Sequence, residues 1–334
     1  MSLSIIIVNY RSTHLICDCI ASVLRFAGGA EGEFLVVDND SGDDGKSIIT
    51  TRFPFVQWID MGYNAGFARA NNAGIKASTG TVLLLLNPDT IAIDDSIPAC
   101  YSRLVASQHS GAGVQLLDAA QQPQISGSFF VKGGLNHLLP LPYWGNVIRW
   151  MAYKANTKVP HAKGSLAVEE VDWISGAFLM VKRAAIEEAG LLDEDFFLYG
   201  EEVEWCSRLK KSGPLCIYGD LKIIHLEGAT INKDQQLHET GYYNLWDKKG
   251  LQLMVSNHLR VRKQYGTAWF MFLLLNYTFG VALFFIASGL QMILGKRGAA
   301  ERFRKSKGFA FNVGRLWRLA PSIIRNKPRF YKMF

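Results

Sequence analysis

The sequence predicts an α/β fold followed by a hydrophobic, basic helical region. Short apolar runs typical of buried strands recur through the first 120 residues, and stretches with helical spacing separate them. Near the C-terminal end, a long uncharged stretch lies between clusters of Lys and Arg. We therefore expect an α/β domain over residues 1–255, with an insertion at about 120–170, and a membrane-associated helical region over residues 256–334.

The first part of the chain predicts a parallel sheet. Strand-like and helix-like stretches alternate there, as they do where helices connect parallel strands. In such sheets ligands bind beyond the carboxyl ends of the strands, and polar side chains follow several of these runs. The expected strands are Leu3–Asn9, Glu33–Asp38, Phe55–Ile59 and Thr81–Leu86, and the expected helices are His14–Phe26 and Ala65–Ala77.

The pattern changes in the middle of the chain. Residues 120–170 are rich in Gly, Pro and aromatic residues, which indicates a long loop or a small helical insertion. Such a segment binds a substrate near a site or belongs to ordinary packing. Regular elements return after residue 170, and we expect a strand at Trp173–Val181, helices at Arg183–Ala189 and Glu201–Lys211, and one or two strands at Leu215–Ile224.

The C-terminal region contains a stretch that could enter a membrane. Ala268–Leu294 holds 27 residues without a charge. As a helix it would be about 40 Å long, against about 30 Å of bilayer hydrocarbon. Basic residues flank both ends, so a single span would leave one cluster on the wrong side of the membrane. Breaks at Gly280 and Gly289 would give a re-entrant hairpin or two interfacial helices, and a helix buried in a soluble core is a further alternative.

The charge of the chain is unevenly distributed. The net charge is +7, yet residues 258–334 contain 15 Lys and Arg and one acidic residue, against 21 basic and 28 acidic residues elsewhere. Aromatic residues are interleaved with these cations, as in segments that bind anionic lipid, and the uncharged stretch favours lipid over nucleic acid. Five scattered cysteines without zinc spacing, and no expected signal peptide, fit a cytoplasmic compartment.

Polar residues that could bind a nucleotide follow the expected strands. Asp38 could accept the imide N–H of a uracil or thymine base, with Tyr10 against that base, or it could cap a turn. Arg69 could meet a phosphate in a segment whose glycines allow close approach, or the segment could be an ordinary helix. The candidates for binding a nucleotide-linked donor are Asn9, Tyr10, Asp38, Asn39, Asn64, Gly66, Arg69, Asn72 and Asn87.

Two further residues could hold a divalent ion. Asp89 lies in Asn87-Pro88-Asp89, at the tip of the apolar run Leu83–Leu86. A carboxylate in this position suits Mg²⁺ or Mn²⁺ bridging two phosphates, although Asn-Pro-Asp is also a natural turn. His225 could be the second ligand, although a lone His is more often structural.

An acidic segment supplies candidates for a general base. Six carboxylates crowd residues 193–204 among bulky apolar neighbours. Like charges beside apolar walls raise carboxyl pKa values toward the range of a general base. Glu201 or Glu202 could take a proton from a hydroxyl, or the cluster could be a solvated helix start. The candidates for binding the acceptor of that reaction are Trp173, Ser175 and Gly176.

Together these pieces resemble glycosyltransferase family 2 and, within it, the rhamnosyltransferase-like branch. The resemblance implies a GT-A fold, a nucleotide-diphosphate sugar donor, Mg or Mn, and inversion by single displacement. The matching segments cover about residues 3–230 in order, and they are Ser4–Tyr10, Val37–Ser41, Asn64–Gly74, Leu86–Asp89, Trp173–Ala177, Phe196–Arg208 and His225–Gly228.

The resemblance also implies roles for individual residues. Asp38 resembles the acid that binds the base, Asp89 stands in the metal-binding acidic motif, and His225 resembles a later metal ligand. Glu202 stands where many members carry the catalytic Asp, so the chain departs from the family pattern there. Asn87 occupies the place of the first acid in a full Asp-x-Asp motif, a form that this branch commonly shows.

Members of this branch often transfer L-rhamnose from dTDP-rhamnose onto a lipid-linked glycan such as O-antigen. That implies a polyprenyl-diphosphate-linked acceptor, met by the insertion at about 120–170, and a site at the cytoplasmic face of the inner (plasma) membrane. A UDP-sugar donor remains an alternative. A nucleotidyltransferase would need a glycine-rich loop, which Asn9–Thr13 lacks, and a non-catalytic scaffold or nucleic-acid binder would have no use for the acidic cluster.

Overall fold

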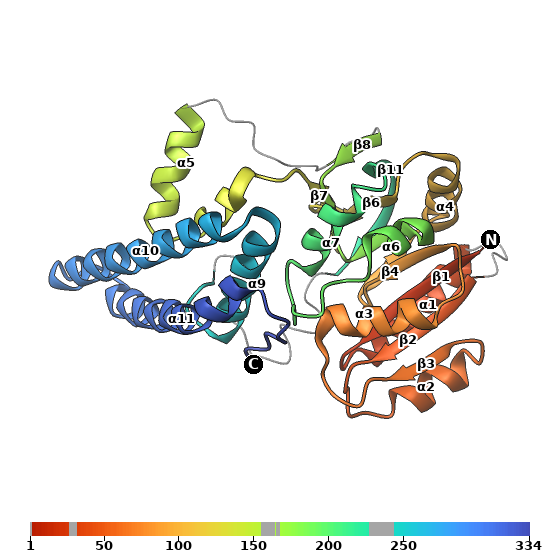
Figure 1. The fold of residues 1–334 in the computed structure, drawn as a ribbon. Coiled ribbons are helices and arrows are strands. Elements are labelled where there is room, and N and C mark those ends of the chain that lie inside the picture. The colour runs from red at the N-terminus through yellow and green to blue at the C-terminus, as the bar shows by residue number, and fades with distance from the viewer. Residues whose placement is uncertain (1, 27–31, 155–163, 165–167, 227–243) are drawn as a thin grey trace. The chain divides into compact units, whose positions relative to one another are not determined.

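The computed structural model describes residues 2–26, 32–154, 164, 168–226 and 244–334. These residues form two compact units, each assembled from separate stretches of the chain (Figure 1). The sheet unit comprises the described parts of residues 1–129, 160–194 and 201–237. The helical unit comprises those of residues 130–159, 195–200 and 238–334.

The division between the units differs in detail from the expected domain boundary. Residue 255 lies inside α9 (Lys248–Tyr265), which belongs entirely to the helical unit. The expected insertion at 120–170 is divided, because residues 130–154 group with the helical unit whereas β8 (Val168–Val171) lies in the sheet unit. Because α9 continues through residue 255, the sequence at that point shows no local sign of a domain boundary.

Within the sheet unit, the described residues form a sheet of nine strands. Their order is β3-β2-β1-β4-β10-β6-β11-β5, and β8 also pairs with β11. A separate short ladder joins β7 (Gly127–Ser128) to β9 (Trp173–Ile174). The strands of the main sheet are β1 Leu3–Asn9, β2 Gly32–Asp38, β3 Gln57–Asp60, β4 Val82–Leu86, β5 Thr90–Ala92, β6 Gly111–Leu117, β8 Val168–Val171, β10 Phe178–Lys182 and β11 Leu215–His225.

The four strands expected in the first 120 residues, β1 to β4, pair in parallel as predicted, and the antiparallel pairings of β10 make the whole sheet mixed. β1 pairs in parallel with β2 and β4, but β10 is antiparallel to β4 and β6. A turn at Ser175–Ala177 breaks the single strand expected at Trp173–Val181. There the Ala177 N–H donates to Ser175 Oγ (3.3 Å) and the Phe178 N–H to the Ser175 carbonyl (3.2 Å). Ser-Gly turn chemistry therefore separates β9 from β10.

Helices cover both faces of this sheet. Ile5 and Ile7 of β1 enter a core shared with α1 and α4, whereas Ile6 enters the core shared with α3, α6 and α7. This alternation follows from the two-residue period of a strand. Gly74 allows α3 to approach β1 closely, because a Cβ there would lie 2.5 Å from Ile6 Cγ2. The helices are α1 Thr13–Phe26, α2 Gly45–Arg52, α3 Gly66–Ala77, α4 Ser96–Ala106, α6 Arg183–Ala189 and α7 Glu201–Leu209.

The helical unit has a hydrophobic core of its own, built on three long helices. α9 begins at Asp247, whose carboxylate accepts the Gly250 N–H (2.8 Å). α10 (Thr267–Ile293) runs unbroken through Gly280 and Gly289, which excludes the break considered at these glycines. Among the described residues it alone is long and apolar enough to cross a membrane. The remaining elements are the 3₁₀ segment η1 Lys132–Leu138, α5 Trp144–Lys154 and α11 Ala299–Arg325.

Candidate active site

The carboxyl ends of β1 and β2 hold Asp38 in a fixed orientation. Asp38 Oδ1 accepts a hydrogen bond from Asn9 Nδ2 (2.8 Å), and Oδ2 accepts one from the Ser41 N–H (3.3 Å). Arg11 and Asp40, just beyond these strands, adopt left-handed backbone conformations (φ 53° and 68°). Strained backbone of this kind concentrates at functional sites. The strand ends therefore present a half-buried, oriented carboxylate.

A second pair of asparagines links β2 to the start of α3. Asn39 Oδ1 accepts the Ala65 N–H (2.7 Å), and Asn39 Nδ2 donates to Asn64 Oδ1 (3.2 Å). Asn64 Oδ1 also accepts the N–H of Gly66, which has a positive φ of 75°. These side chains brace the loop before α3, and their contact with a donor stays a prediction.

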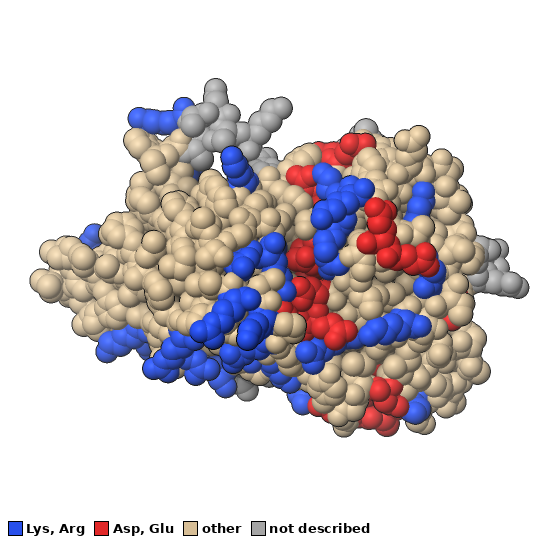
Figure 2. Space-filling model, viewed as in Figure 1, with Lys and Arg blue, Asp and Glu red and all other residues tan. Residues whose placement is uncertain are grey.

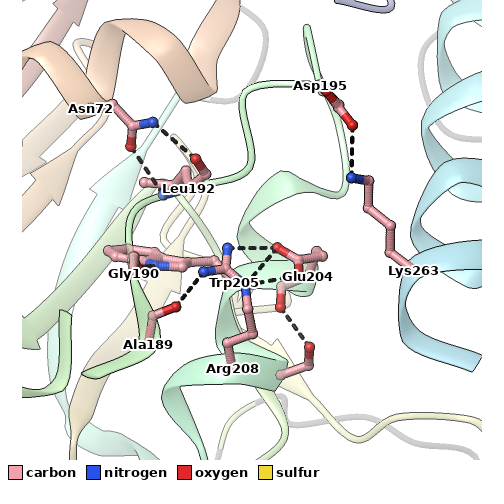
Figure 3. A network of polar contacts seen from close by, with 10 residues as sticks. Asn72, Ala189, Gly190, Leu192, Asp195, Glu204, Trp205, Arg208 and Lys263 are labelled. Atoms are coloured by element: carbon pink, nitrogen blue, oxygen red, sulfur yellow. Dashed lines mark hydrogen bonds and ion pairs between the residues drawn. The ribbon is translucent and has the colours of Figure 1, made fainter. Parts of the chain in front are cut away.

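Asn72, on α3, directs its hydrogen bonds to the segment between α6 and α7 (Figure 3), and Arg69 of the same helix does likewise. Asn72 is buried and brackets Leu192, donating to its carbonyl (2.9 Å) and accepting its N–H (3.0 Å). Arg69 Nε donates to the Glu194 carbonyl (3.2 Å). In the structure both side chains hold this segment against α3, so their predicted contact with a phosphate or sugar remains a prediction.

Asp89 and His225 lie together at the ends of β4 and β11. His225 Nε2 is 3.5 Å from Asp89 Oδ1 and 3.4 Å from Asn87 Nδ2. The register of β11 against β5 sets His225 opposite Thr90, next to Asp89 in the chain. Both side chains are largely shielded from solvent, at 8% exposed for Asp89 and 13% for His225. The structure thus brings together the two residues predicted to bind a metal.

Gln124 orients the imidazole of His225. Gln124 Nε2 donates to the His225 carbonyl (3.0 Å), so its Oε1, 3.0 Å from His225 Nδ1, accepts the ring N–H. That leaves the lone pair of Nε2 on the side of Asp89. Residues that orient a metal-binding His in this way are typical of metal sites. Gln124 was not predicted, because nothing distinguishes it from its neighbours in the polar run Gln121–Gln124.

The donor set fits a divalent ion shared with a substrate. The described residues contain no group of three or more His, Cys, Asp or Glu that could hold a metal by themselves. Mg²⁺ is commonly held by one or two carboxylates together with substrate phosphates, and Mn²⁺ also accepts imidazole nitrogen. One oxygen from Asp89 and one nitrogen from His225 match that arrangement. The continuation of the matching motif, Glu227 and Gly228, lies outside the described residues.

Three carboxylates of the acidic segment form ion pairs. Glu204 forms a bidentate pair with Arg208, whose Nη1 donates to the Ala189 carbonyl (Figure 3). Glu194 pairs with Lys76 at 3.7 Å in the sheet unit, and Asp195 with Lys263 at 2.7 Å in the helical unit. Glu201 and Glu202, the predicted candidates for a base, lie at the start of α7.

Glu201 and Glu202 differ in their surroundings. Glu201 is buried, at 3% exposed, and its Oε2 has no hydrogen-bond partner among the described residues. Burial, with a smaller contribution from Glu202, raises the pKa of Glu201 well above its usual range. Glu202 is half-buried. Glu201 therefore holds its proton to a higher pH than an exposed carboxyl does.

The turn between β9 and β10 lies beside Glu202. A Cβ at Gly176 would be 3.2 Å from the Phe67 ring and 3.7 Å from Glu202 Cβ, so glycine allows the turn to approach both. Trp173 and Ser175 are half-buried on either side of Ile174. The three predicted acceptor residues thus lie in or next to this turn, and contact with an acceptor stays a prediction.

One backbone hydrogen bond connects this turn to the Asp89 motif. The Asn87 N–H donates to the Ala177 carbonyl (3.0 Å), continuing the β4–β10 ladder, in which Leu86 is opposite Phe178. The Asp89–His225 pair and the turn beside Glu202 are therefore parts of one arrangement. An oriented carboxylate–imidazole pair next to a second carboxylate can hold an ion and accept a proton at neighbouring points.

Comparison with known proteins relates this arrangement to a family. Residues 4–124, which include the ends of β1, β2 and β4, match the family model of Glycosyl transferase family 2. This part of the chain is therefore similar to glycosyl transferase family 2. Asp38 and Asp89 lie within the matched residues, whereas Glu202 and His225 lie beyond them.

Two relatives of this chain are glycan-building enzymes. The chain is 30% identical over 219 residues to the low-salt glycan biosynthesis hexosyltransferase Agl10 of Haloferax volcanii. It is 26% identical over 231 residues to the N-acetylglucosaminyl-diphospho-decaprenol L-rhamnosyltransferase of Mycobacterium tuberculosis. Each match covers 63% of this chain. The matched part makes up 71% of the mycobacterial protein but 62% of the Haloferax protein, so the chain spans less than two thirds of the length of the Haloferax protein.

Solved structures with a similar fold are also glycosyltransferases. The mannosyltransferase PcManGT of Pyrobaculum calidifontis, solved with GDP-Man and Mn²⁺, aligns with a TM-score of 0.51 at 12% identity and covers 95% of this chain and 87% of its own. GalNAc-T7, solved with UDP, GalNAc and Mn²⁺, aligns with a TM-score of 0.51 at 12% identity over 81% of this chain and 56% of its own. At this identity the likeness shows the fold, which is GT-A, as the sequence resemblance implied.

Proposed function

We propose that the chain is a metal-dependent, inverting glycosyltransferase that moves a sugar from a nucleotide-diphosphate donor to a lipid-linked acceptor. The observation that carries the proposal is the link from Asp89 and His225, through the Asn87–Ala177 hydrogen bond, to the turn beside Glu202. It sets a candidate ion site next to a candidate base. The family of the N-terminal residues supports glycosyl transfer over the nucleotidyl transfer considered as an alternative.

In this proposal the ends of β1 and β2 bind the nucleotide. Asp38, whose carboxylate is fixed by Asn9 and Ser41, accepts the imide N–H of a pyrimidine base. Tyr10, which follows Asn9 at the same strand end, lies against the base. Asn39, Asn64 and Gly66 hold the loop that approaches the donor. A hydrogen-bond acceptor held in this way favours a base with a matching N–H, because a base without that donor would leave the carboxylate unpaired.

Asp89 and His225 hold the ion in this proposal. A bound Mg²⁺ or Mn²⁺ would neutralise the negative charge that develops on the leaving diphosphate. Asp89 Oδ1 and His225 Nε2 are the ligands, and Gln124 keeps the imidazole in the tautomer that leaves Nε2 available. Asn87, 3.4 Å from Nε2, keeps the ring in place.

Glu202 is the general base in this proposal. Its carboxylate takes the proton from an acceptor hydroxyl while the hydroxyl oxygen bonds to the anomeric carbon. The bond between that carbon and the diphosphate oxygen breaks on the opposite face, so the configuration inverts and the nucleotide diphosphate leaves with the bonding electrons. Burial raises the pKa of the neighbouring Glu201, which disfavours a second negative charge next to the base.

For the substrates we propose L-rhamnose from dTDP-rhamnose and a polyprenyl-diphosphate-linked glycan. Support comes from the mycobacterial relative, whose name specifies L-rhamnosyl transfer and a diphospho-decaprenol substrate. The apolar helix α10 and the basic C-terminal region support a place at the cytoplasmic face of the plasma membrane, in contact with anionic lipid. The reaction would then belong to the synthesis of a bacterial surface polysaccharide such as O-antigen.

A UDP-sugar donor is the second candidate. The chain is 23% identical over 208 residues to a poly-β-1,6-N-acetyl-D-glucosamine synthase of Staphylococcus epidermidis. A carboxylate such as Asp38 accepts the imide N–H of uracil as readily as that of thymine. The base alone therefore does not distinguish the two donors.

The test measures nucleotide diphosphate released by the purified full chain in detergent with Mg²⁺ or Mn²⁺. dTDP-rhamnose and a panel of UDP-sugars are compared, each with and without a polyprenyl-diphosphate-linked acceptor. Release from dTDP-rhamnose alone supports the proposal, and release from a UDP-sugar alone replaces the donor. An Asp89→Ala variant with full activity would contradict the metal site, and a lack of release from every donor and acceptor would contradict glycosyl transfer.

A further inference from the structure

One face of α10 is apolar and exposed from one end of the helix to the other. Its members recur at spacings of three, four or seven residues, so they form a single stripe along the 27-residue helix. We call this the α10 stripe. Their exposed fractions lie between 44% and 83%, and the residues are Phe272, Leu275, Phe279, Ile286, Leu290 and Ile293.

The opposite face of α10 is packed into the core of the helical unit. The rings of Tyr277 and Phe284 both contact Phe309 of α11, with centroids 6.1 and 6.2 Å apart. Ser288 Oγ lies 3.4 Å from Ser306 Oγ, also on α11. Helix α10 is therefore held against α11 over much of its length, and its stripe points away from that core.

Helix α11 exposes a basic face next to this stripe. The exposed residues of α11 again recur with helical spacing, and most of them are cations. The aromatic ring of Phe311, which is 62% exposed, lies in the same series. Glu301 is the single acidic residue of the helix. We call this the α11 basic face, and it consists of Arg304, Lys307, Arg315, Arg318 and Arg325.

Aromatic residues lie between the stripe and the basic face. Trp317 of α11 is 39% exposed, and its Nε1 donates to Thr278 Oγ1 of α10 (2.9 Å). Further along the contact between α10 and α11, the rings of Phe285 and Phe303 meet edge to face, with their centroids 5.8 Å apart. Figure 2 shows the surface over α10 largely without charge, whereas Lys and Arg gather along α11. The order of apolar, aromatic and basic surface is that of a protein face seated at a lipid interface.

These contacts bear on how α10 could meet a membrane. If α10 crossed the bilayer, α11 would have to cross beside it or separate from it. Crossing together would expose Arg304, Arg315 and Arg318 to hydrocarbon, which is strongly unfavourable. Separation would expose Phe309 and the buried serines Ser288 and Ser306.

We propose that α10 lies in the plane of one membrane leaflet, with its stripe in the upper acyl region and the α11 basic face on anionic headgroups. The partner is therefore a lipid surface. A second copy of the chain, paired through the α10 stripe, would cover the apolar residues but leave the cations of α11 without counter-charge. This inference deepens the membrane contact in the proposed function and rests on that contact, but not on glycosyl transfer.

The experiment measures depth along α10 in the full chain. All five native cysteines are buried, so a maleimide fluorophore would label a cysteine introduced at the surface. Four single variants place the probe along the stripe, and a fifth, Val105→Cys on α4, serves as an exposed reference outside it. Vesicles of phosphatidylcholine and phosphatidylglycerol carry nitroxide quenchers at a shallow or a deep position of the acyl chain. The stripe variants are Phe272→Cys, Phe279→Cys, Ile286→Cys and Ile293→Cys.

The in-plane arrangement predicts stronger quenching from the shallow position, to a similar extent at all four sites. A spanning helix would instead give the strongest deep quenching at the middle sites, Phe279 and Ile286, with shallow quenching at the ends, and this profile would overturn the proposal. Absence of quenching at every stripe site, together with a stripe-dependent dimer in size-exclusion chromatography, would also overturn it in favour of self-association. None of these readouts depends on catalysis, so failure here leaves the transferase proposal intact.

Charge variants test the second half of the proposal. Arg315→Gln combined with Arg318→Gln should weaken binding to vesicles containing phosphatidylglycerol by about fivefold per residue and reduce its salt dependence. Ile286→Ser combined with Leu290→Ser should weaken binding to vesicles with and without anionic lipid. Equal binding of the arginine variant and the native chain to anionic vesicles would contradict the role given to the α11 basic face.

Discussion

His225 Nε2 lies 3.5 Å from Asp89 Oδ1 because β11 runs antiparallel to β5 and sets His225 opposite Thr90, the residue after Asp89. The pair therefore depends on strand register and not on proximity in the chain. A shift of one residue in that register would turn the His225 side chain to the other face of the sheet. The placement of these two side chains side by side is thus a property of the assembled sheet.

Removing the residue that orients His225 should weaken metal binding. Gln124→Leu loses the acceptor for the Nδ1–H of His225, so the ring can rotate or change tautomer. We expect activity or metal affinity to fall by about 10- to 100-fold, as for other outer partners of metal-bound His. The measurement is activity against Mn²⁺ concentration. Gln122→Leu, an exposed neighbour in the same loop, is the control, and equal curves for the two variants would contradict the role of Gln124.

Replacing each of the two adjacent glutamates by glutamine should distinguish their roles. Glu202→Gln removes the proposed base, and kcat should fall by about 10²- to 10⁴-fold, the usual contribution of a general base. Glu201→Gln should retain most of the turnover, because burial disfavours the charged form of its carboxyl and the neutral amide replaces it without loss of charge. Steady-state kinetics with circular dichroism as a check on folding distinguishes the two. The reverse order of losses would assign the base to Glu201.

The raised pKa of Glu201 predicts a pH-dependent stability. The folded chain binds this proton more tightly than the unfolded chain, so the contribution of Glu201 to stability is fully present below its ordinary pKa of 4.5. It decreases as the pH rises above that value toward the folded pKa, by about 1.4 kcal/mol for each unit crossed. Glu201→Gln cannot ionise. The melting temperature of the native chain should therefore fall relative to that of the variant as the pH is raised toward neutrality, and parallel curves would contradict the assignment.

Asn72 is expected to matter for stability as well as for any contact with substrate. Asn72→Ala leaves the N–H and the carbonyl of Leu192 without partners in a buried place. The free energy of unfolding should fall by about 1–3 kcal/mol for each group left unsatisfied. Urea denaturation measures this. Asn136→Ala, where the side chain is exposed, is the matched control and should be nearly neutral.

Sequence patterns predicted several elements because their signals are local. β1 occupies Leu3–Asn9 and α6 occupies Arg183–Ala189, both as expected from apolar spacing and a terminal glycine. The strand at Trp173–Val181 was wrong, because an apolar run does not reveal that Ser175 forms a turn inside it. The parallel pairing expected in the first 120 residues was confirmed for β1 to β4, whereas β10, from a later segment, enters antiparallel to β4.

The site could be predicted in its parts but not in its connections. Motif resemblance nominated Asp89 and His225, and the structure places them together. Gln124 had no signal, because its role arises only when residues far apart in the chain meet. The acidic segment holds six carboxylates, of which Glu201 and Glu202 were the candidates for a base. Glu204 pairs with Arg208 one turn along the same helix, whereas the pairing of Asp195 with Lys263 depends on tertiary structure, which composition and spacing do not encode.

The attachment of α7 has a consequence for how this enzyme could diversify. Trp205 Nε1 bonds the Gly190 carbonyl and the Arg208–Glu204 pair ties the second half of the helix to α6, so the anchor lies one turn away from Glu202. The turn at Ser175–Ala177 carries none of this anchoring. Except at Gly176, where a Cβ would lie 3.2 Å from the Phe67 ring, substitutions in that turn could therefore alter the proposed contact with an acceptor while Glu202 keeps its position. Lineages that build different glycans could thus arise by drift in a few turn residues.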